Sequence, residues 1–230
     1  MTTRDFHYYE PINGHGLSHN PLNALVAPRP IGWISTRDAQ GRVNLAPYSF
    51  FNAFNYEPPI IGFSSIAWKD SVQNASETRE FVWNLVTREL GDKMNQTSTP
   101  LPHGEDEFPF AGLTAVPGRV VNVPRVGESR AAMECKVIDI VQFRNVQGEK
   151  VSGWMVLGEV VAVHIDKALL KDGVYQTAAA HPIMRSGGMN DYVQVLPENV
   201  FQIARPEGAA HPASHGKASF ALGVNQLLRP

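Results

Sequence analysis

The sequence predicts a mainly β fold with short helices, built as an antiparallel barrel or sandwich. Two long β runs, AAMECKVIDIVQFRN and VSGWMVLGEVVAVHI, are joined by the short segment VQGEK. Long strands paired in this way favour a barrel or sandwich over an open parallel sheet. From Pro28 onward, shorter β segments alternate with turn residues. Short helices attached to an antiparallel β core are therefore expected.

The first half of the chain reads as a hairpin, a third strand and two helices. RPIGWIST and VNLAPYSFFNAF are predicted strands around the turn DAQGR, and PPIIGFSS is the third strand. DSVQNASETRE is predicted to be helical, FVWNLVT to be a buried strand, and RELGDKMNQT to be a second short helix.

The second half adds a loop rich in Pro and Gly at residues 100–128 before the two long strands. DKALLKDGV is predicted to hold a short helix and ENVFQIAR a last strand. We expect an N-terminal extension at residues 1–20, one domain at residues 21–205 and an extended, Pro-containing tail at residues 206–230.

Composition excludes several classes of function. With 230 residues, 18% charged residues and a net charge of -2, the chain has no basic footprint for nucleic acid. Because it lacks an apolar N-terminal leader and long apolar runs, we expect a cytoplasmic protein without membrane contact. The single cysteine, Cys135, excludes an internal disulfide and zinc sites built on paired cysteines, and no metal site is expected.

The stretch GFSSIAWKDSVQN, residues 62–74, has two readings. Asp70 fits a helix N-cap, and Gln73 completes a capping-box pattern three residues later. The hydroxyl and ammonium donors at the same strand-to-helix junction also suit a phosphate, because a helix N-terminus offers free N–H groups and partial positive charge. These donors are Ser64, Ser65, Lys69 and Ser71.

A second candidate region lies in the predicted hairpin. Trp33 to Thr36 place an aromatic, an aliphatic and two hydroxyl side chains on one strand, and NLAPYSFFN follows. Pro47 removes an N–H from that second strand, which indicates an edge or bulge with backbone groups open to a ligand. An apolar slot with a few polar groups suits a flat heterocycle. The alternative is that these aromatic residues belong to the core and surface.

Together these segments resemble the flavin reductase-like, FMN-binding split-barrel family, whose members are often associated with flavoprotein oxygenases. The resemblance rests on ALVAPRPIGWISTRDAQGRVNLAPYSFFNAFNYEPPIIGFSS and KDSVQNASETREFVWNLVT, and extends over about residues 20–200. It implies a six-stranded antiparallel split barrel that forms a homodimer. It also implies FMN bound noncovalently near the subunit interface, with FAD as a possible substitute, and a flavin-dependent oxygenase as a possible partner.

The resemblance assigns cofactor-binding residues in three groups. The isoalloxazine ring would be bordered by Trp33, Ile34, Ser35 and Thr36. Ring and ribityl chain would run along Ala46, Pro47, Tyr48 and Ser49. The phosphate would be surrounded by Asn52, Ser64, Ser65, Lys69 and Ser71.

The implied reaction is hydride transfer from NAD(P)H to the flavin, for which no catalytic acid or base is required. The segment PIMRSGGMNDY is the candidate nicotinamide side: Arg185 would meet a phosphate, Gly187 would allow close approach and Tyr192 would stack. His181 would border this pocket. The alternative is a turn with a surface arginine and a core tyrosine.

Two functions follow as hypotheses. The first is an NAD(P)H-dependent flavin reductase, and the second is a flavin-binding or electron-transfer protein without that turnover. An oxidase of the related pyridoxamine-phosphate type is a weaker third, because few basic residues surround Lys69. The acidic residues of HGEDEF, at residues 103–108, are interpreted as a solvated loop.

Overall fold

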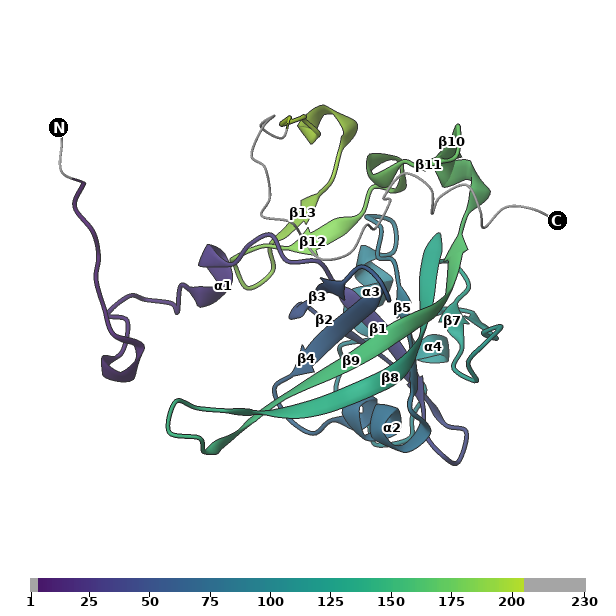
Figure 1. Ribbon diagram of the computed structural model, residues 1–230, viewed down its shortest axis with the longest axis horizontal. Helices are drawn as coiled ribbons and strands as arrows, with labels where there is room; N and C mark the ends of the chain where they lie inside the picture. The colour runs from purple at the N-terminus through teal and green to yellow at the C-terminus, as the bar shows by residue number, and fades with distance from the viewer. Residues whose placement is uncertain (1–3, 205–230) are drawn as a thin grey trace, which may run out of the picture. The chain divides into compact units, whose positions relative to one another are not determined.

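A single curled antiparallel sheet forms the framework of the protein, as a computed structural model that describes residues 4–204 shows (Figure 1). Its seven strands follow the order β2-β1-β5-β8-β9-β4-β3. Their bounds are β1 Gly32–Arg37, β2 Val43–Tyr48, β3 Phe51–Asn55, β4 Ile60–Ser65, β5 Glu80–Asn84, β8 Ala131–Arg144 and β9 Lys150–Ile165. The mainly β split-barrel architecture predicted from the sequence is confirmed.

The connection between β2 and β3 makes the sheet curl. These strands lie at opposite ends of the sheet order, yet only residues 49 and 50 separate them in the chain. Two residues span only about 7 Å, so the two edges must come close together. The sequence reading joined β2 and β3 into one strand, and the break at Ser49 and Phe50 gives seven strands instead of six.

The barrel interior is apolar and is covered by helix α2, Asp70–Thr78. Ile34, Phe63 and Phe81 from three strands are fully buried there with Cys135. Val72 and Ala75 of α2 belong to the same cluster. Burial raises the pKa of the Cys135 thiol far above its usual range, which makes it an inert core residue.

A second apolar cluster lies on the other face of β1 and β2. Trp33 and Leu45 pack there with residues of α3, Gly91–Gln96, and α4, Glu107–Phe110. Because successive side chains of a strand point to opposite faces, Trp33 belongs to this cluster and Ile34 to the barrel interior. Strand β1 is therefore buried on both faces.

Gly158 on β9 lets the barrel interior pack closely. A Cβ at this position would lie 2.4 Å from Cε1 of Phe81 and 3.1 Å from Cβ of Cys135. Such a contact is far inside van der Waals distance, so the Phe81 ring occupies the space that any other residue at 158 would need.

Glu134 on β8 holds the loop at residues 118–123 against the sheet. Its carboxylate is fully buried and accepts the backbone N–H groups of Arg119, Val120 and Val121 at 2.8, 2.6 and 2.9 Å. His164 on β9 contacts it at 2.6 Å. Burial alone would raise the pKa of Glu134, but these hydrogen bonds outweigh burial and lower it to about 2.

Short elements complete the described residues. Residues 166–174, predicted to hold a short helix, contain a short 3-10 helix and then enter a small hairpin, whose tight turn Gly173 supports with a φ of 76°. The strand predicted at ENVFQIAR is wrong for residues 200–204, and residue 205 lies outside the described residues. The remaining elements are η1 Pro11–Asn13, α1 Leu22–Leu25, β6 Ala115–Val116, β7 Arg125–Val126, η2 Lys167–Leu169, β10 Leu170–Lys171, β11 Val174–Tyr175, η3 Thr177–Ala180, β12 Ile183–Arg185, β13 Tyr192–Gln194 and η4 Pro197–Asn199.

The chain divides into two units, residues 1–200 and 201–230. The sheet and all of the helices and strands given above belong to the first unit. The tail predicted at residues 206–230 lies outside the described residues. Over residues 4–204, no helix has both the length and the apolar character needed to cross a membrane.

Candidate functional site

Helix α2 begins with free donors. Lys69, not Asp70, is its N-cap, and no side chain caps the helix. The N–H groups of Val72 and Gln73 both donate to the Lys69 carbonyl at 2.9 Å, and those of Asp70 and Ser71 have no backbone acceptor in the described part of the chain. The predicted capping box is also wrong, because the Gln73 side chain bonds Trp68 and Glu77 instead.

A cavity of about 350 Å³, here called the helix-end cavity, opens at this helix N-terminus. The Lys69 ammonium is exposed and forms no hydrogen bond or ion pair within residues 4–204. The Ser71 hydroxyl accepts the Asn44 amide N–H at 2.9 Å. The cavity is lined by Asn44, Ala46, Pro47, Tyr48, Lys69, Asp70, Ser71, Thr97, Ser98, Thr99, Pro100, Leu101 and Glu107. An unpaired ammonium, free N–H groups and several hydroxyls suit an anion such as phosphate.

Glu107 is the unexpected group in the helix-end cavity. Only 7% of it is exposed, and its carboxylate accepts the Leu45 N–H at 2.8 Å. Burial raises the pKa of Glu107, and the nearby carboxylates of Asp106 and Asp70 act in the same direction. The interpretation of HGEDEF as a solvated loop is therefore wrong for Glu107, which α4 turns inward. Its oxygen atoms offer hydrogen-bond acceptors to ligand hydroxyl groups.

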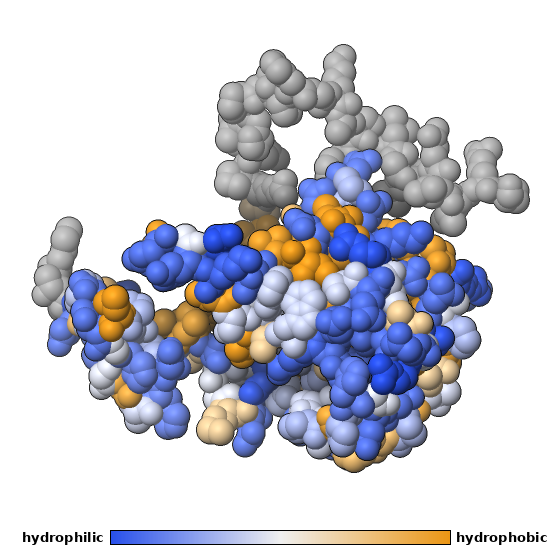
Figure 2. Space-filling view, turned by 90° about the horizontal axis from the view of Figure 1, so that it is seen from below, coloured by the Kyte–Doolittle hydropathy of each residue, from blue (hydrophilic) through white to orange (hydrophobic). Residues whose placement is uncertain are grey.

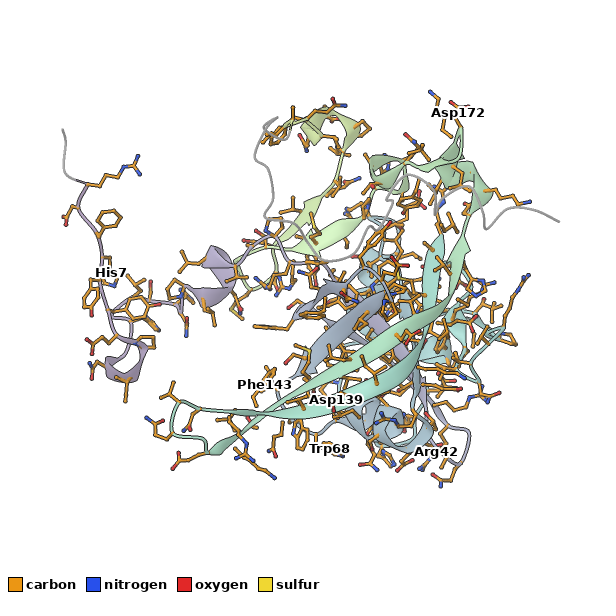
Figure 3. The ribbon with its side chains drawn as sticks, in the orientation of Figure 1. His7, Arg42, Trp68, Asp139, Phe143 and Asp172 are labelled. Carbon is orange, nitrogen blue, oxygen red and sulfur yellow. The ribbon has the colours of Figure 1, made fainter. Side chains whose placement is uncertain are left out.

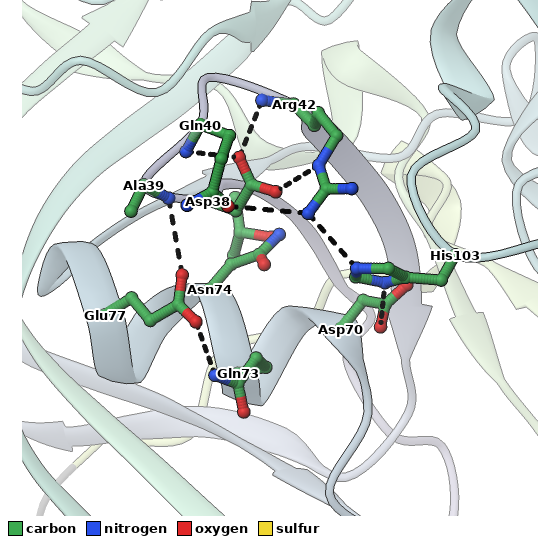
Figure 4. Close-up of polar contacts among 10 residues, drawn as sticks. Asp38, Ala39, Gln40, Arg42, Asp70, Gln73, Asn74, Glu77 and His103 are labelled. Carbon is green, nitrogen blue, oxygen red and sulfur yellow. Dashed lines mark hydrogen bonds and ion pairs between the residues drawn. The ribbon is translucent and has the colours of Figure 1, made fainter.

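A polar network ties the loop around His103 to the start of α2 (Figure 4). Arg42 contacts His103 Nε2 at 3.2 Å, and His103 Nδ1 lies 3.0 Å from Asp70 Oδ1. Arginine can only donate, so Nε2 must accept and the ring proton must sit on Nδ1, from which it donates to Asp70. Asp38 in turn pairs with Arg42 at 2.5 Å. The hydrogen bond from His103 partly offsets the negative charge of Asp70 at the wall of the helix-end cavity.

The residues predicted to surround a phosphate do not meet at one place. Lys69 and Ser71 line the helix-end cavity, whereas Asn52 and Ser64 line another. Ser65 is buried and donates to the Ala67 carbonyl at 2.6 Å. The alternation of β4 places Ser64 and Ser65 on opposite faces, which sequence proximity conceals.

The second cavity, about 330 Å³, is here called the aromatic cavity. Ser49, Asn52 and Ser64, all predicted site residues, contribute polar groups to it. Its other walls are Leu22, Asn23, Val26, Pro28, Arg29, Pro30, Phe50, Phe51, Phe54, Phe143 and Met155. Tyr48 lines the helix-end cavity, and its chain neighbour Ser49 lines the aromatic cavity. An apolar cavity with a few polar groups suits a flat heterocycle.

The four residues predicted to border a ring, Trp33 to Thr36, are fully buried. Each polar group among them has a partner inside the protein: Trp33 Nε1 donates to Thr97 Oγ1 at 3.0 Å, and Ser35 Oγ to the Pro124 carbonyl at 2.6 Å. Thr36 Oγ1 accepts from the Asn74 amide at 3.1 Å. Their side chains thus form a rigid layer behind the cavities and present no surface to a ligand.

The C-terminal candidates gather at two further cavities. The arginine cavity, about 880 Å³, includes Arg185 and Gly187, and the Tyr192 cavity, about 400 Å³, includes Arg185 and Tyr192. His181 has a left-handed backbone with a φ of 50° and lines none of these four cavities. Gly187 does permit a close approach, but to Ala24, whose Cβ would lie 2.6 Å from an added Cβ.

Several residues that line the cavities were not predicted from the sequence. Thr97, Ser98 and Thr99 follow α3, and their position after a predicted helix gave no indication that the loop returns to β2. Arg29 lines two cavities, and its position before Pro30 suggested only the start of a strand. The run of hydroxyl residues in NQTSTP was the one available signal for the first group.

Comparisons with known proteins show what this chain is similar to. The model of the "Flavin reductase like domain" matches residues 25–184. An uncharacterized protein of Halalkalibacterium halodurans is 39% identical over 176 residues, which cover 74% of this chain and 83% of that protein. Nitrilotriacetate monooxygenase component B from Bacillus cereus has a TM-score of 0.75 and 26% identity, covering 88% of this chain and 98% of that one. The 2-nitrobenzoate 2-nitroreductase of Pseudomonas fluorescens has a TM-score of 0.69 and 25% identity, with 84% and 91% covered.

Proposed function

The chain belongs to the family of flavin reductase-like domains, and on this premise we propose that it is an FMN-binding, NAD(P)H-dependent flavin reductase. The observation that carries the proposal is the helix-end cavity, where the unpaired ammonium of Lys69 meets the free N–H groups at the start of α2. This donor set suits the phosphate of FMN.

The walls of the helix-end cavity and of the aromatic cavity would hold different parts of a flavin. Lys69 and Ser71 would hold the phosphate, and Glu107 would accept hydrogen bonds from ribityl hydroxyl groups. Ala46, Pro47 and Tyr48 lead from there toward the aromatic cavity. The ring would lie near Ser49, Asn52 and Ser64, with the buried layer of Trp33 to Thr36 behind it. FAD would also fit this scheme if its additional nucleotide extended outward.

Bound flavin supplies the acceptor for the hydride that NAD(P)H gives up as it becomes NAD(P)⁺. The residues of this chain need to hold both partners in contact and exclude water, and no side chain has to act as acid or base in that step. Rigid placement of the walls is therefore their main contribution. The full burial of β1 and the hydrogen bonds of its polar side chains provide it.

The proposed assembly is a homodimer that supplies reduced flavin to an oxygenase. Apolar side chains remain exposed on and near the aromatic cavity, among them Phe50 at 47%, Phe54 at 54% and Phe143 at 36%. Figure 3 shows Phe143 on the outer part of the long β8–β9 hairpin, and Figure 2 shows apolar residues interrupting a mostly hydrophilic face. Such surfaces suit a second subunit. The name of the Bacillus cereus structure, a monooxygenase component, supports an oxygenase partner.

The test is to load the purified protein with FMN and to follow the oxidation of NADH and NADPH, with FMN, FAD or riboflavin added in separate reactions. We expect a yellow protein that consumes at least one nicotinamide. A flavin-loaded protein that consumes neither under any of these conditions would reject the reductase and leave a flavin-binding or electron-transfer role. Sedimentation of the same sample measures the dimer.

A further inference from the structure

Three of the four cavities share walls with one another, and the three together are here called the groove. Asn23 and Arg29 line both the aromatic cavity and the arginine cavity. Arg185 and Met189 line both the arginine cavity and the Tyr192 cavity. The groove therefore runs from an apolar end through a cationic centre to an end that carries an aromatic ring and polar side chains. The change from apolar to cationic to aromatic surroundings becomes apparent only when the three cavities are taken together.

Arg29 is the buried cation at the centre of this groove. It is 7% exposed, and its guanidinium donates to the carbonyls of Asn23, Val26 and Ser186. Its Nε is buried and has no hydrogen-bond partner among the described residues. Within residues 4–204 it forms no ion pair with a carboxylate, although Asp191 lines the same cavity.

Arg185 adds a second positive charge directly opposite. The backbones of Arg29 and Arg185 form an isolated antiparallel bridge with two hydrogen bonds of 2.9 Å. Three carbonyls of the following loop fix the Arg185 guanidinium, those of Gly188, Met189 and Asp191. Burial lowers the pKa of Arg29, and the charge of Arg185 lowers it further.

Arg29 and Arg185 face each other and form no ion pair within residues 4–204, which is unfavourable in the free protein. Like charges placed opposite each other across paired strands destabilise the pair, and a buried charge without a partner costs solvation energy. Both costs disappear when a multiply charged anion enters the cavity, because guanidinium groups bind phosphate oxygens through paired N–H donors. The cavity of about 880 Å³ has room for such a group.

We propose that the groove binds a nicotinamide dinucleotide with its diphosphate between Arg29 and Arg185. The assignment rests on the proposed reductase function. The nicotinamide would enter the aromatic cavity, where the flavin ring is proposed to lie, and the adenine would reach Tyr192. The Arg185 guanidinium already lies 4.8 Å from the centroid of the Tyr192 ring, so charge and stacking surface adjoin.

The experiment titrates FMN-loaded protein with ADP-ribose, which carries the diphosphate but cannot donate a hydride, and with adenosine, which lacks the diphosphate. Arg29→Gln removes the charge, whereas Arg29→Lys keeps it without the planar fork. Arg119→Gln is the matched control, because Arg119 is exposed on the loop held by Glu134. Calorimetry gives the affinities, and thermal unfolding reports whether each variant folds.

We expect ADP-ribose to bind the Arg29→Gln protein about ten- to a hundredfold more weakly than wild type, with Arg29→Lys between them. Adenosine should bind wild type and Arg29→Gln alike, and Arg119→Gln should match wild type. In turnover, the KM for NAD(P)H should rise while kcat changes little. If Arg29→Gln does not fold, Arg29→Lys decides, since it retains a charged donor toward the neighbouring carbonyls.

Unchanged ADP-ribose affinity and unchanged KM in a folded Arg29 variant would overturn the groove while the reductase function stood. The opposite outcome is that ADP-ribose binding depends on Arg29 but the wild-type protein never oxidises NAD(P)H. This outcome would reject the reductase function and support a dinucleotide groove. The two ideas therefore fail separately.

Discussion

Glu134 and Arg29 are both buried charges, and their surroundings differ sharply. Glu134 is 0% exposed and accepts three backbone N–H groups besides its contact with His164. Arg29 is 7% exposed, faces another arginine and has a buried Nε that finds no partner within residues 4–204. One charge is fully satisfied by the fold, and the other is not.

The difference separates architecture from binding. A buried carboxylate whose hydrogen bonds are all made inside the protein holds a loop and needs no ligand. A buried cation at the wall of a cavity can donate its unsatisfied N–H groups to a bound anion. Lys69 differs from both, because its ammonium is exposed at the helix-end cavity and has no partner within residues 4–204. Substitution of Glu134 should therefore lower the free energy of unfolding, substitution of Lys69 should weaken flavin binding, and substitution of Arg29 should weaken dinucleotide binding.

The largest effect on stability is expected from Glu134→Gln. A glutamine amide would set donors against the N–H groups of the loop at residues 118–123, and we expect the free energy of unfolding to fall by about 3 kcal/mol. Urea unfolding measures it, with Glu89→Gln as the control because Glu89 is exposed. Equal stability of the two variants would contradict the structural role of Glu134.

The pH dependence of unfolding should report the same carboxylate. The folded pKa of Glu134, about 2, lies below its ordinary value of 4.5, so its contribution is complete above pH 4.5 and is lost as the pH falls toward 2. Urea midpoints recorded between pH 7 and pH 3 should therefore decline more steeply for wild type than for Glu134→Gln. Parallel declines would show that other carboxylates carry the acid sensitivity.

Lys69→Ala should weaken FMN binding about tenfold, which corresponds to one exposed, charge-assisted hydrogen bond. The free energy of unfolding should change by less than about 0.5 kcal/mol, because the Lys69 side chain has no partner within residues 4–204. Flavin fluorescence titration measures the affinity, and Lys171→Ala, on exposed β10, is the control. Unchanged flavin affinity would remove Lys69 from the proposed site.

Arg29→Met should change the free energy of unfolding by about 1 kcal/mol or less, well below the loss expected for Glu134→Gln. It removes a buried charge that faces Arg185, and this gain offsets the lost hydrogen bonds to nearby carbonyls. Chemical unfolding of the flavin-free protein measures the change. A loss as large as that of Glu134→Gln would place Arg29 among the structural charges and would weaken its contrast with Glu134.

The sequence predicted the strands well because their signals are local. Alternating and β-branched runs indicated β1, β4, β5, β8 and β9 near their observed bounds. The break between β2 and β3 was missed, since NLAPYSFFN remains strand-like through residues 49 and 50. The helical pattern of α2 was also recognised, but its N-cap was placed at Asp70 because Asp is a common capping residue and Lys is not.

The candidate site was predicted only in part. Residues on one chain segment were recognised together, including Ala46, Pro47 and Tyr48, which line the helix-end cavity as a group. Glu107 and Thr97 reach the same cavity from distant loops, and no local pattern indicates such a meeting. The predicted phosphate group around Ser64 and Ser65 is divided by the pleat of β4.

By itself, the sequence determined the strand-forming segments, the helix that follows GFSS and the chemical types available for binding, because these depend on neighbours in the chain. Only the tertiary structure decided that Trp33 to Thr36 are buried, that Glu107 turns inward and that Arg29 faces Arg185. Those outcomes depend on which strands pair and where the sheet curls. Closure of the sheet brings together residues far apart in sequence, and burial then decides which polar groups remain available to a ligand.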